Sequence, residues 1–455
     1  MNPKDEPDQY CVPPEIYVLL AAAAADQKRE IVVELIQRHP QGLKFSSHDR
    51  QGFEVDSRKL RLKPSPFNRG VDLESINLQG VNLGRIDLPA ATLRKADLRA
   101  AELNRANLSG VDLAGALLQG AALGEANLRG AMLEDADLES ANLRFADLRG
   151  SILEGANLAH ADLWGSNLEA VALTNANLEA AVLNEANLEQ ADLVGACLKN
   201  ATIEKANLRG AKLVGANLSG AHMKGADLRD AVLAEARLEQ VDLLSCDLTH
   251  VYLADSWLER TRCSKEQFGS AIGEEVAGDF KGAEKGYLAL ERNFEGLGDS
   301  VAARWAYCKR RRMGKLFAYD MAIQSFKHRD GLNTLRWYAR YAADQFVEWL
   351  CDYGESVPRV MASMMTVYVL FIVLYKLTHS VVRTYQTAGG LVQVPTGKLM
   401  DLAIFSLLAM TTSGSPAVGL QPSSEVVHLL TGTEALLGIG LTGLLGFVAG
   451  NRMRR

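Results

Sequence analysis

An aliphatic side chain recurs at every fifth position from Leu73 to Leu258 without a gap. All 38 of these positions hold Leu except Ile203 and Met223, and 26 of the residues two places earlier are Ala. A period of five matches neither the 3.6-residue period of a helix nor the two-residue period of a strand. Because a short, regular repeat is typical of solenoids, the pattern predicts one continuous coiled rod.

The period predicts a four-sided coil with five residues on each side. We expect the Leu and the Ala to point inward, the Ala because the interior is narrow. The Asn or Asp between them is expected to occupy corner-like backbone and to bond to it locally. Leu side chains twenty residues apart, such as Leu113 and Leu133, then stack in a ladder. Roughly nine coils at about 4.8 Å each give a rod about 45 Å long.

Tandem units such as ANLRGAMLEDADLESANLRFADLRG resemble the pentapeptide-repeat family from Val71 to about Glu259. The resemblance implies an all-β right-handed quadrilateral β-helix as the fold of residues 71–260. Some members of that family resemble DNA in shape and charge and bind topoisomerases, and residues 71–260 carry a net charge of −12 here. Two interpretations remain: the acidic residues keep a rod in solution, or they form a surface for a protein partner. Nucleic acid is not expected as a partner.

A solenoid needs caps, because its end coils expose the edge of the core. Residues 1–70 are expected to form a helical capping region at one end. At the other end, Tyr252 and Trp257 take outward positions, and the following segment is expected to cover them. Other apolar residues also take outward positions, either as a contact surface or by drift: Met132, Ile152 and Ala172 at twenty-residue steps, and Phe145 and Trp164.

Residues 261–357 read as a helical connector. Apolar residues at helical spacing predict two helices within 282–320, divided by GLGDS, in a pattern that resembles hairpins found beside membrane-linked pentapeptide repeats. The basic run Lys309–Arg312 is either a solvated face or a signal for topology and acidic lipid. A third helix, with Asn333 as its N-cap, carries the apolar stripe Leu335, Tyr338, Ala342, Phe346 and Trp349. That stripe either faces a core or lies on a membrane surface.

Two stretches are apolar and long enough to span a bilayer, about residues 360–379 and 426–450. Between them, residues 399–411 are apolar but too short to cross, and a Thr/Gly/Pro loop follows. Irregular backbone at membrane depth is tolerated only where protein or a water-filled cavity surrounds it. The order therefore predicts a re-entrant pore helix between two spans.

The stretch FSLLAMTTSG and the apolar helix after it resemble the two-span potassium-channel-like pore module, over about residues 358–455. The resemblance implies a homotetramer around one pore, a hinge or gate at Gly438 and Gly440, and an intramembrane carboxylate at Glu434. It places the selectivity filter, about residues 411–416, on Thr411, Thr412, Ser413, Gly414, Ser415 and Pro416. Proline cannot take the positive φ of the second filter glycine of that family. A short, wide filter with carbonyls from Thr412 and Ser413 and poor potassium selectivity is therefore expected.

The favoured function is a homotetrameric ion channel, weakly selective and cation-leaning, whose β-helix regulates the pore or binds an unknown cytoplasmic protein. The alternative is a membrane-anchored binding or scaffold protein, a DNA-mimic topoisomerase binder for example, without conduction. An enzyme is not expected, because the eight His and six Cys form no catalytic or metal-binding pattern. No cofactor is expected beyond permeant monovalent ions, and the other partner is membrane lipid.

Basic residues flank the two predicted spans, with Lys309–Arg312 before them and Arg452, Arg454 and Arg455 after them. The positive-inside rule then predicts a multi-pass protein of the inner (plasma) membrane, with both termini and the β-helix cytoplasmic and residues 383–425 outside. Six scattered Cys without CxxC spacing agree with reduced cytosolic thiols.

Overall fold

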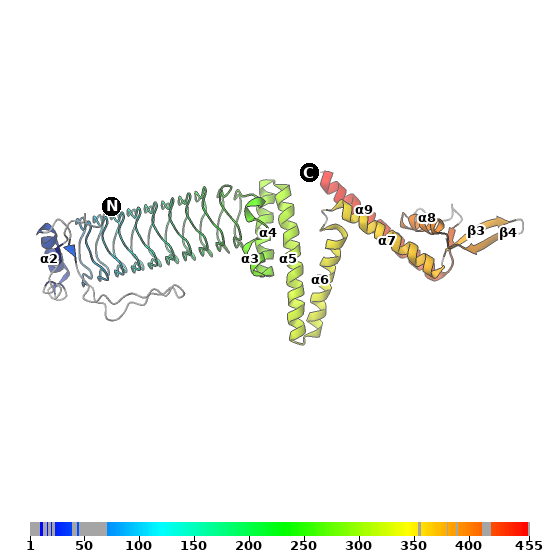
Figure 1. Ribbon diagram of the computed structural model, residues 1–455, viewed down its shortest axis with the longest axis horizontal. Helices are drawn as coiled ribbons and strands as arrows, with labels where there is room; N and C mark the ends of the chain where they lie inside the picture. Colours follow the sequence, from blue (N-terminus) through cyan, green and yellow to red (C-terminus); the bar gives the residue numbers. More distant parts are fainter. Residues whose placement is uncertain are drawn as a thin grey trace, which may run out of the picture. The chain divides into compact units, whose positions relative to one another are not determined.

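The computed structural model describes residues 10–11, 16, 20, 23–38, 43–44, 71–353, 356–379, 381–387, 390–411 and 420–453 (Figure 1). The chain divides into two compact units, Met1–Gly314 and Lys315–Arg455, and each is described by itself.

Residues 71–263 form a parallel β-helix in which each coil takes twenty residues, as the period of five predicts. Short parallel bridges join residues twenty apart, for example Asp112 to Met132 and Met132 to Ile152. Backbone bonds run in both directions: the Met132 N–H donates to the Val111 carbonyl (2.8 Å), and its carbonyl accepts from Leu113 (2.7 Å). All 38 aliphatic positions are buried, as are the residues two places earlier except Val81, which is half-buried. The predicted inward orientation of both sets is confirmed.

The expected place of Asn and Asp is wrong in one respect. These residues sit at the bridge in the middle of each side, where the ladder bonds require extended backbone, and not at the corner. Their side chains reach forward to the corner: Asp72 Oδ1 accepts from the Glu74 N–H (3.0 Å). The corner residue with left-handed backbone is every fifth one, such as Ser75 (φ 57°) and Gly80 (φ 65°). The Asn or Asp thus supports the turn without adopting its strained conformation.

The described N-terminal residues form helix α2 (Ala25–Arg38) and a two-stranded parallel pair, β1 (Tyr10–Cys11) with β2 (Leu43–Lys44). Lys28 in α2 is buried, and its ammonium pairs with Asp72 of the first coil at 3.3 Å. This contact places α2 at the first coil, where the sequence predicts a helical cap.

Four helical segments follow the last coil: η1 (Lys265–Phe268), α3 (Gly273–Ala277), α4 (Phe280–Leu297) and α5 (Ser300–Lys327). The predicted division at GLGDS is confirmed between α4 and α5. Buried Phe268, Ile272 and Leu290 supply apolar surface at this end of the β-helix. Tyr252 contacts Gly273, where any side chain would collide with its ring. Trp257 stays 54% exposed, so the expectation that the following segment covers it is wrong.

Polar side chains of this cap take the place of the missing next coil. Glu274 Oε1 accepts from the backbone N–H groups of Leu253 and Ala254, each at 2.6 Å. Gln267 Nε2 donates to the carbonyls of Leu243 and Cys246. Burial raises the pKa of the Glu274 carboxyl above its usual range. The edge groups that would otherwise be unpaired are satisfied by side chains, which ends the ladder without leaving it open.

Asn293→Ala is expected to open the last coil. Asn293 is buried, accepts from the Thr261 N–H (3.2 Å) and donates to the Thr261 carbonyl (2.8 Å). Its loss leaves two buried backbone groups unpaired, at a cost of about 2–4 kcal/mol. Amide exchange of the full chain, read by mass spectrometry over 251–263, should then quicken about 30-fold or more. Glu295→Ala, exposed on the same helix, is the control, and equal exchange in both variants would refute the capping role.

Neither interpretation of the basic run Lys309–Arg312, a solvated face or a signal for topology and acidic lipid, holds for its first two residues. The Lys309 ammonium contacts Glu275 (3.0 Å) and the Ser270 carbonyl (2.7 Å), and the Arg310 guanidinium contacts Glu291 (2.6 Å). All four of these charged side chains are less than one quarter exposed. Lys309 and Arg310 therefore fasten α5 to the cap and are neither a solvated face nor free for lipid.

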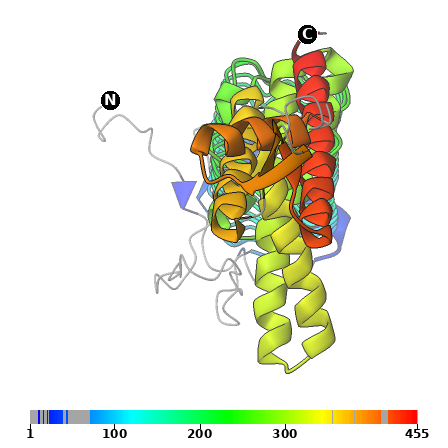
Figure 2. The same cartoon turned by 90° about the vertical axis from the view of Figure 1, so that its right-hand side faces the viewer.

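The second unit contains the rest of α5, helix α6 (Gly331–Cys351), and two long helices, α7 (Val357–Thr378) and α9 (Glu425–Met453). Asp330, and not Asn333, caps α6, because its side chain accepts from the Asn333 N–H. Both α7 and α9 are long and apolar enough to cross a membrane, by length and composition. Figures 1 and 2 show them side by side, with the short helix α8 (Leu399–Met410) against them.

A small antiparallel sheet, which the sequence did not predict, is formed by two strands between α7 and α8 and one strand after α8. Strand β3 (Val381–Thr387) pairs with β4 (Gly390–Pro395) as a hairpin and with β5 (Leu420–Pro422) on its other edge. The sheet order is β4-β3-β5. Because β5 follows α8 in the chain, its pairing with β3 brings the chain back, after α8, to the C-terminal end of α7.

Candidate functional site

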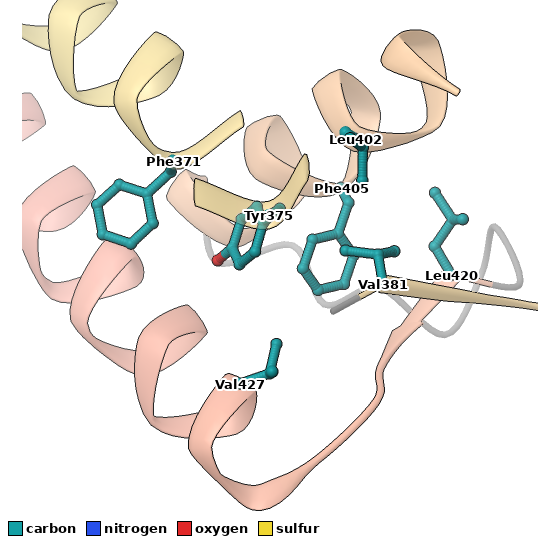
Figure 3. Packing of buried hydrophobic residues seen from close by; sticks show 7 residues of the cluster. All are labelled: Phe371, Tyr375, Val381, Leu402, Phe405, Leu420 and Val427. Atoms are coloured by element: carbon teal, nitrogen blue, oxygen red, sulfur yellow. The ribbon is translucent and has the colours of Figure 1, made fainter. Parts of the chain in front are cut away.

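Helix α8 is held between the two long apolar helices. Its buried side chains Leu402 and Phe405 join residues of α7, α9 and the sheet in one apolar cluster, which also contains Phe371, Tyr375, Val381, Leu420 and Val427 (Figure 3). The Tyr375 ring meets Phe405 edge to face, with centroids 5.2 Å apart. This packing fixes α8 against both neighbours and sets its depth along them.

The path of the chain through this cluster starts and finishes at the same end of the α7–α9 pair. The start of α8 lies there, since Leu402 packs with Val381, Leu420 and Val427. The end of α8 reaches halfway along α9, because a Cβ atom added at Gly438 would lie 2.1 Å from the Met410 carbonyl oxygen. Gly438 is the midpoint of the apolar stretch Val426–Gly450. The chain is back at the first end by Leu420, where β5 pairs with β3.

Asp401 anchors the first turn of α8 to the sheet. Its Oδ1 accepts from the Arg383 guanidinium of β3 (2.8 Å), and its Oδ2 accepts from the Thr396 hydroxyl (2.7 Å). The carboxylate is nearly buried and also lies at the positive end of the helix dipole. Arg383 and Asp401 thus form an ion pair that orients α8.

Glu434 joins helices α7, α8 and α9. Its side chain is fully buried, and its carboxylate accepts hydrogen bonds from Tyr375 Oη of α7 (2.7 Å) and from Ser406 Oγ of α8. Figure 3 shows the Tyr375 hydroxyl pointing toward α9. A buried carboxylate is retained only where donors compensate for its lost hydration, and here the donors come from two different helices. Glu434 therefore fixes the rotation of α9 against α7 and α8.

The other predicted site residues fall into two groups. Thr411 follows the last turn of α8, and its N–H and hydroxyl both donate to the Leu407 carbonyl (3.0 and 2.8 Å). Gly440 lies in α9, and a Cβ there would have no atom within 4 Å. The remaining filter candidates lie outside the described residues: Thr412, Ser413, Gly414, Ser415 and Pro416.

Sequence reasoning did not select Tyr375 and Ser406, the two donors to Glu434. A signal was present, since both are polar residues inside apolar helices, where such groups need partners. Nothing local pairs either of them with Glu434, which is 59 and 28 residues away.

The faces of α7 and α9 that do not contact α8 expose many apolar side chains. On α7 these are Met361, Met365, Val369, Leu370, Val373 and Leu377, and on α9 they are Val426, Leu429, Leu436, Leu437, Ile439 and Phe447. Contiguous apolar surface of this extent needs lipid or another protein to cover it.

Comparison with known proteins identifies the repeat. A family model described as pentapeptide repeats (8 copies) matches residues 69–105, 106–144, 136–171, 172–210 and 211–249. HetL, a pentapeptide repeat protein involved in heterocyst differentiation regulation in the cyanobacterium Nostoc sp. strain PCC 7120, is 30% identical. That match covers 45% of this chain and 86% of HetL, with a TM-score of 0.25. This chain belongs to the pentapeptide-repeat family.

Two further solved structures are similar over the repeats. A pentapeptide repeat protein from the thylakoid lumen of Arabidopsis thaliana is 34% identical, covering 23% of this chain and 68% of that one, with a TM-score of 0.15. QnrB1, a plasmid-mediated fluoroquinolone resistance protein, is 19% identical, covering 45% and 96%, with a TM-score of 0.27. No curated protein sequence matches this chain. The residues matched by the family model end at 249, so any function of the C-terminal unit must be argued from its own geometry.

Proposed function

We propose that this protein is a homotetrameric ion channel of the inner (plasma) membrane. The C-terminal unit surrounds the ion pathway, and the β-helix is a cytoplasmic domain that regulates it or binds a protein partner. The observation that carries the proposal is the path of α8, which ends halfway along α9 before the chain returns to the end where it began.

The length of α8 fits this role. Twelve residues at 1.5 Å each make a helix about 18 Å long, slightly more than half of a bilayer core about 30 Å thick. A helix of that length, placed between two spans and ending at the midpoint of one of them, reaches the middle of the membrane without crossing it.

The return segment supports an assembly of several copies. Residues 412–419 must connect the end of α8 at mid-depth with β5 at the outer end. Such a short connection, rich in Gly, Ser and Thr, cannot satisfy its backbone groups in lipid, so protein or water must surround it. Copies of the chain arranged around a shared axis provide both, and the exposed apolar faces of α7 and α9 provide surface for lipid and for neighbouring copies.

The direction of α8 favours cations. Its C-terminal end, with the partial negative charge of the helix dipole, points toward the middle of the membrane, where a permeating ion is least hydrated. Carbonyls of Thr412 and Ser413 are proposed as the narrow part of a filter with weak selectivity among monovalent cations. Pro416 stands where a full stack of carbonyl rings would need positive φ, which proline cannot adopt.

The alternative function is a membrane-anchored binding protein without conduction, and the β-helix gives it some support. Phe145, which is 53% exposed, and the half-buried Trp164 form an edge-to-face pair on one corner of the rod, with centroids 4.8 Å apart. The Arg144 guanidinium lies 4.3 Å from the Trp164 ring. An aromatic and arginine surface of this kind suits a protein partner, but it does not account for α8, which an anchor does not need.

The purified full chain in a planar lipid bilayer tests the two functions. We expect cation-leaning currents whose conductance or selectivity changes when Ser415 or Pro416 is replaced. Gly443→Ala serves as the matched variant, because it adds a methyl group in open space at a residue with no predicted role. A bilayer that stays silent at varied voltage, pH and lipid composition would favour the anchored binding protein.

A further inference from the structure

One side of the β-helix is apolar where the side before it is polar. Figure 1 shows the coils stacked along the rod, so that each side is a ladder of bridge residues twenty apart. We call one stretch of such a side the apolar face. It consists of five bridge residues and of the residue two places after each: Ile152, Ala172, Asp192, Lys212 and Val232, with Glu154, Thr174, Val194, Val214 and Ala234.

The composition of the apolar face differs from that of the neighbouring side in the same coils. Six of its ten residues are apolar and three are charged. On the neighbouring side, from Asp147 to Arg229, the ten residues at the same two positions include none that is apolar and seven that are charged. Because burying charges is costly, the apolar face is the side that another surface can cover with less loss of hydration.

The residue two places after each bridge lies over the same side of the rod as that bridge. Thr174 Oγ1 donates to Asp192 Oδ1 of the apolar face (3.4 Å). The guanidinium of Arg149, at the corner before the face, instead pairs with Asp147 of the neighbouring side (2.6 Å). Val194 holds in its coil the position of Thr174, and therefore adds apolar surface to the face.

The corners beside the centre of the apolar face are flat. Three of the four corner residues that flank the coils of Asp192 and Lys212 carry no side chain, namely Gly195, Gly210 and Gly215. The corner conformation alone does not require glycine, since Phe145 adopts it with φ 58°. A second flat surface can thus approach the face from both edges, as in the stacking of two sheets about 10 Å apart.

The centre of the apolar face carries one anion and one cation in adjacent coils. The Lys212 ammonium lies 3.7 Å from Asp192 Oδ2, and the lysine side chain remains 59% exposed. The pair is therefore open to a further charged group of either sign.

We propose that the apolar face binds the same face of a second copy of this chain, with the two rods antiparallel. A two-fold axis between the coils of Asp192 and Lys212, perpendicular to the rod and in the plane of the contact, places Asp192 of each copy opposite Lys212 of the other. The other residues that this axis brings opposite each other are Val194 with Val214, Ala172 with Val232, and Thr174 with Ala234. The inference goes beyond the proposed function and rests on neither conduction nor membrane insertion.

Charge complementarity selects the antiparallel orientation. The two ion pairs then alternate in one neutral cluster of four charges, surrounded by apolar contacts. Parallel rods would instead place Asp192 opposite Asp192 and Lys212 opposite Lys212, and like charges in contact oppose association. The ion pair therefore sets direction and register, and the contact is closed, because each face is used once.

Cysteine cross-linking of full-length protein in detergent tests the contact. Two variants, Thr174→Cys and Ala234→Cys, carry tags of different size and are coexpressed, and a short bis-maleimide is added. In one chain these positions lie three coils apart, about 14 Å, whereas the two-fold axis brings them opposite each other in two copies. We expect a cross-linked product that contains both tags. The unmodified chain reports the background from its own six cysteines.

Charge reversal tests the register in the same cross-linking pair. Lys212→Asp should lower the yield at least about tenfold, because four carboxylates then meet at the axis. Adding Asp192→Lys to it should restore the yield, since the opposite pairs are formed again. Lys224→Asp, an exposed residue on the opposite side of the rod, is the control with the same change of charge.

Three results would overturn the proposal. They are a mixed sample at background level, cross-linking of Thr174→Cys with itself, which indicates parallel rods, and equal yields in Lys212→Asp and Lys224→Asp. Melting temperatures equal to that of the unmodified chain show that a variant is folded, and Ala172→Cys with Val232→Cys is the second pair if the first is not. Because cross-linking does not depend on currents, silent bilayers with normal cross-linking would reject conduction alone.

Discussion

Replacing Glu434 with Ala is expected to abolish ion currents and to lower the melting temperature of the full chain in detergent by roughly 5–15 °C. The substitution leaves the Tyr375 and Ser406 hydroxyls without an acceptor in a buried site. Each unpaired group costs about 1–3 kcal/mol, before any cavity is counted. Since the two donors come from α7 and α8, both helices lose their fixed position against α9.

Two variants sharpen the Glu434 experiment. Glu434→Gln keeps one acceptor oxygen and should lose less stability than Glu434→Ala. Thr433→Val changes the neighbouring exposed residue, whose hydroxyl bonds only within its own helix turn, and should melt as the wild type does. If Glu434→Ala and Thr433→Val have the same melting temperature and the same currents, Glu434 does not join the three helices.

Gly438→Ala is the second substitution with a large expected effect. A methyl group there would meet the Met410 carbonyl oxygen at 2.1 Å and the Met410 side chain at 2.8 Å. The end of α8 must then move away from α9, at a cost of about 1–3 kcal/mol, and residues 411–416 move with it. We expect currents to be lost or strongly reduced, measured in planar bilayers and compared at equal protein incorporation.

Gly440→Ala is the matched control for Gly438→Ala. The new methyl group meets no atom within 4 Å, and Ala is favoured over Gly in a helix interior by about 1 kcal/mol. If this variant keeps normal stability and conduction while Gly438→Ala loses them, the effect is assigned to the contact with α8. A changed open probability with normal stability would instead support the predicted hinge. Equal losses in both would contradict the close approach of α8.

The β-helix could be predicted almost residue by residue, because every coil repeats the same local environment. The burial of Leu113 depends on Leu133 and its own neighbours and not on distant segments. The corner geometry was missed because its positive φ falls on residues as varied as Ser75, Phe145 and His160. Because so many residue types occur there, composition does not mark the corner position. The turn is supported by the side chain of the Asn or Asp three places earlier.

The C-terminal unit was predictable only at the level of hydropathy and length. The two long apolar helices and the short one between them follow from the apolar runs. The sheet does not, because β3 pairs with β5 across 37 residues or more and no local pattern encodes that register. The ion pair of Arg383 with Asp401 depends on the same sheet. The filter at residues 412–416 lies outside the described residues and stays a prediction from resemblance.

Sided labelling of the full chain in sealed vesicles tests most directly whether α8 enters and leaves by one membrane face. Single cysteines at Gln386 in β3 and Gln421 in β5, both exposed, would report on the chain before and after α8. We expect a membrane-impermeant maleimide to label both from the same side, and a cysteine at Leu407 near the end of α8 to stay unlabelled while the membrane is intact. Labelling of Gln386 and Gln421 from opposite sides, or free labelling of Leu407 from the bulk solution on the outer side, would contradict it.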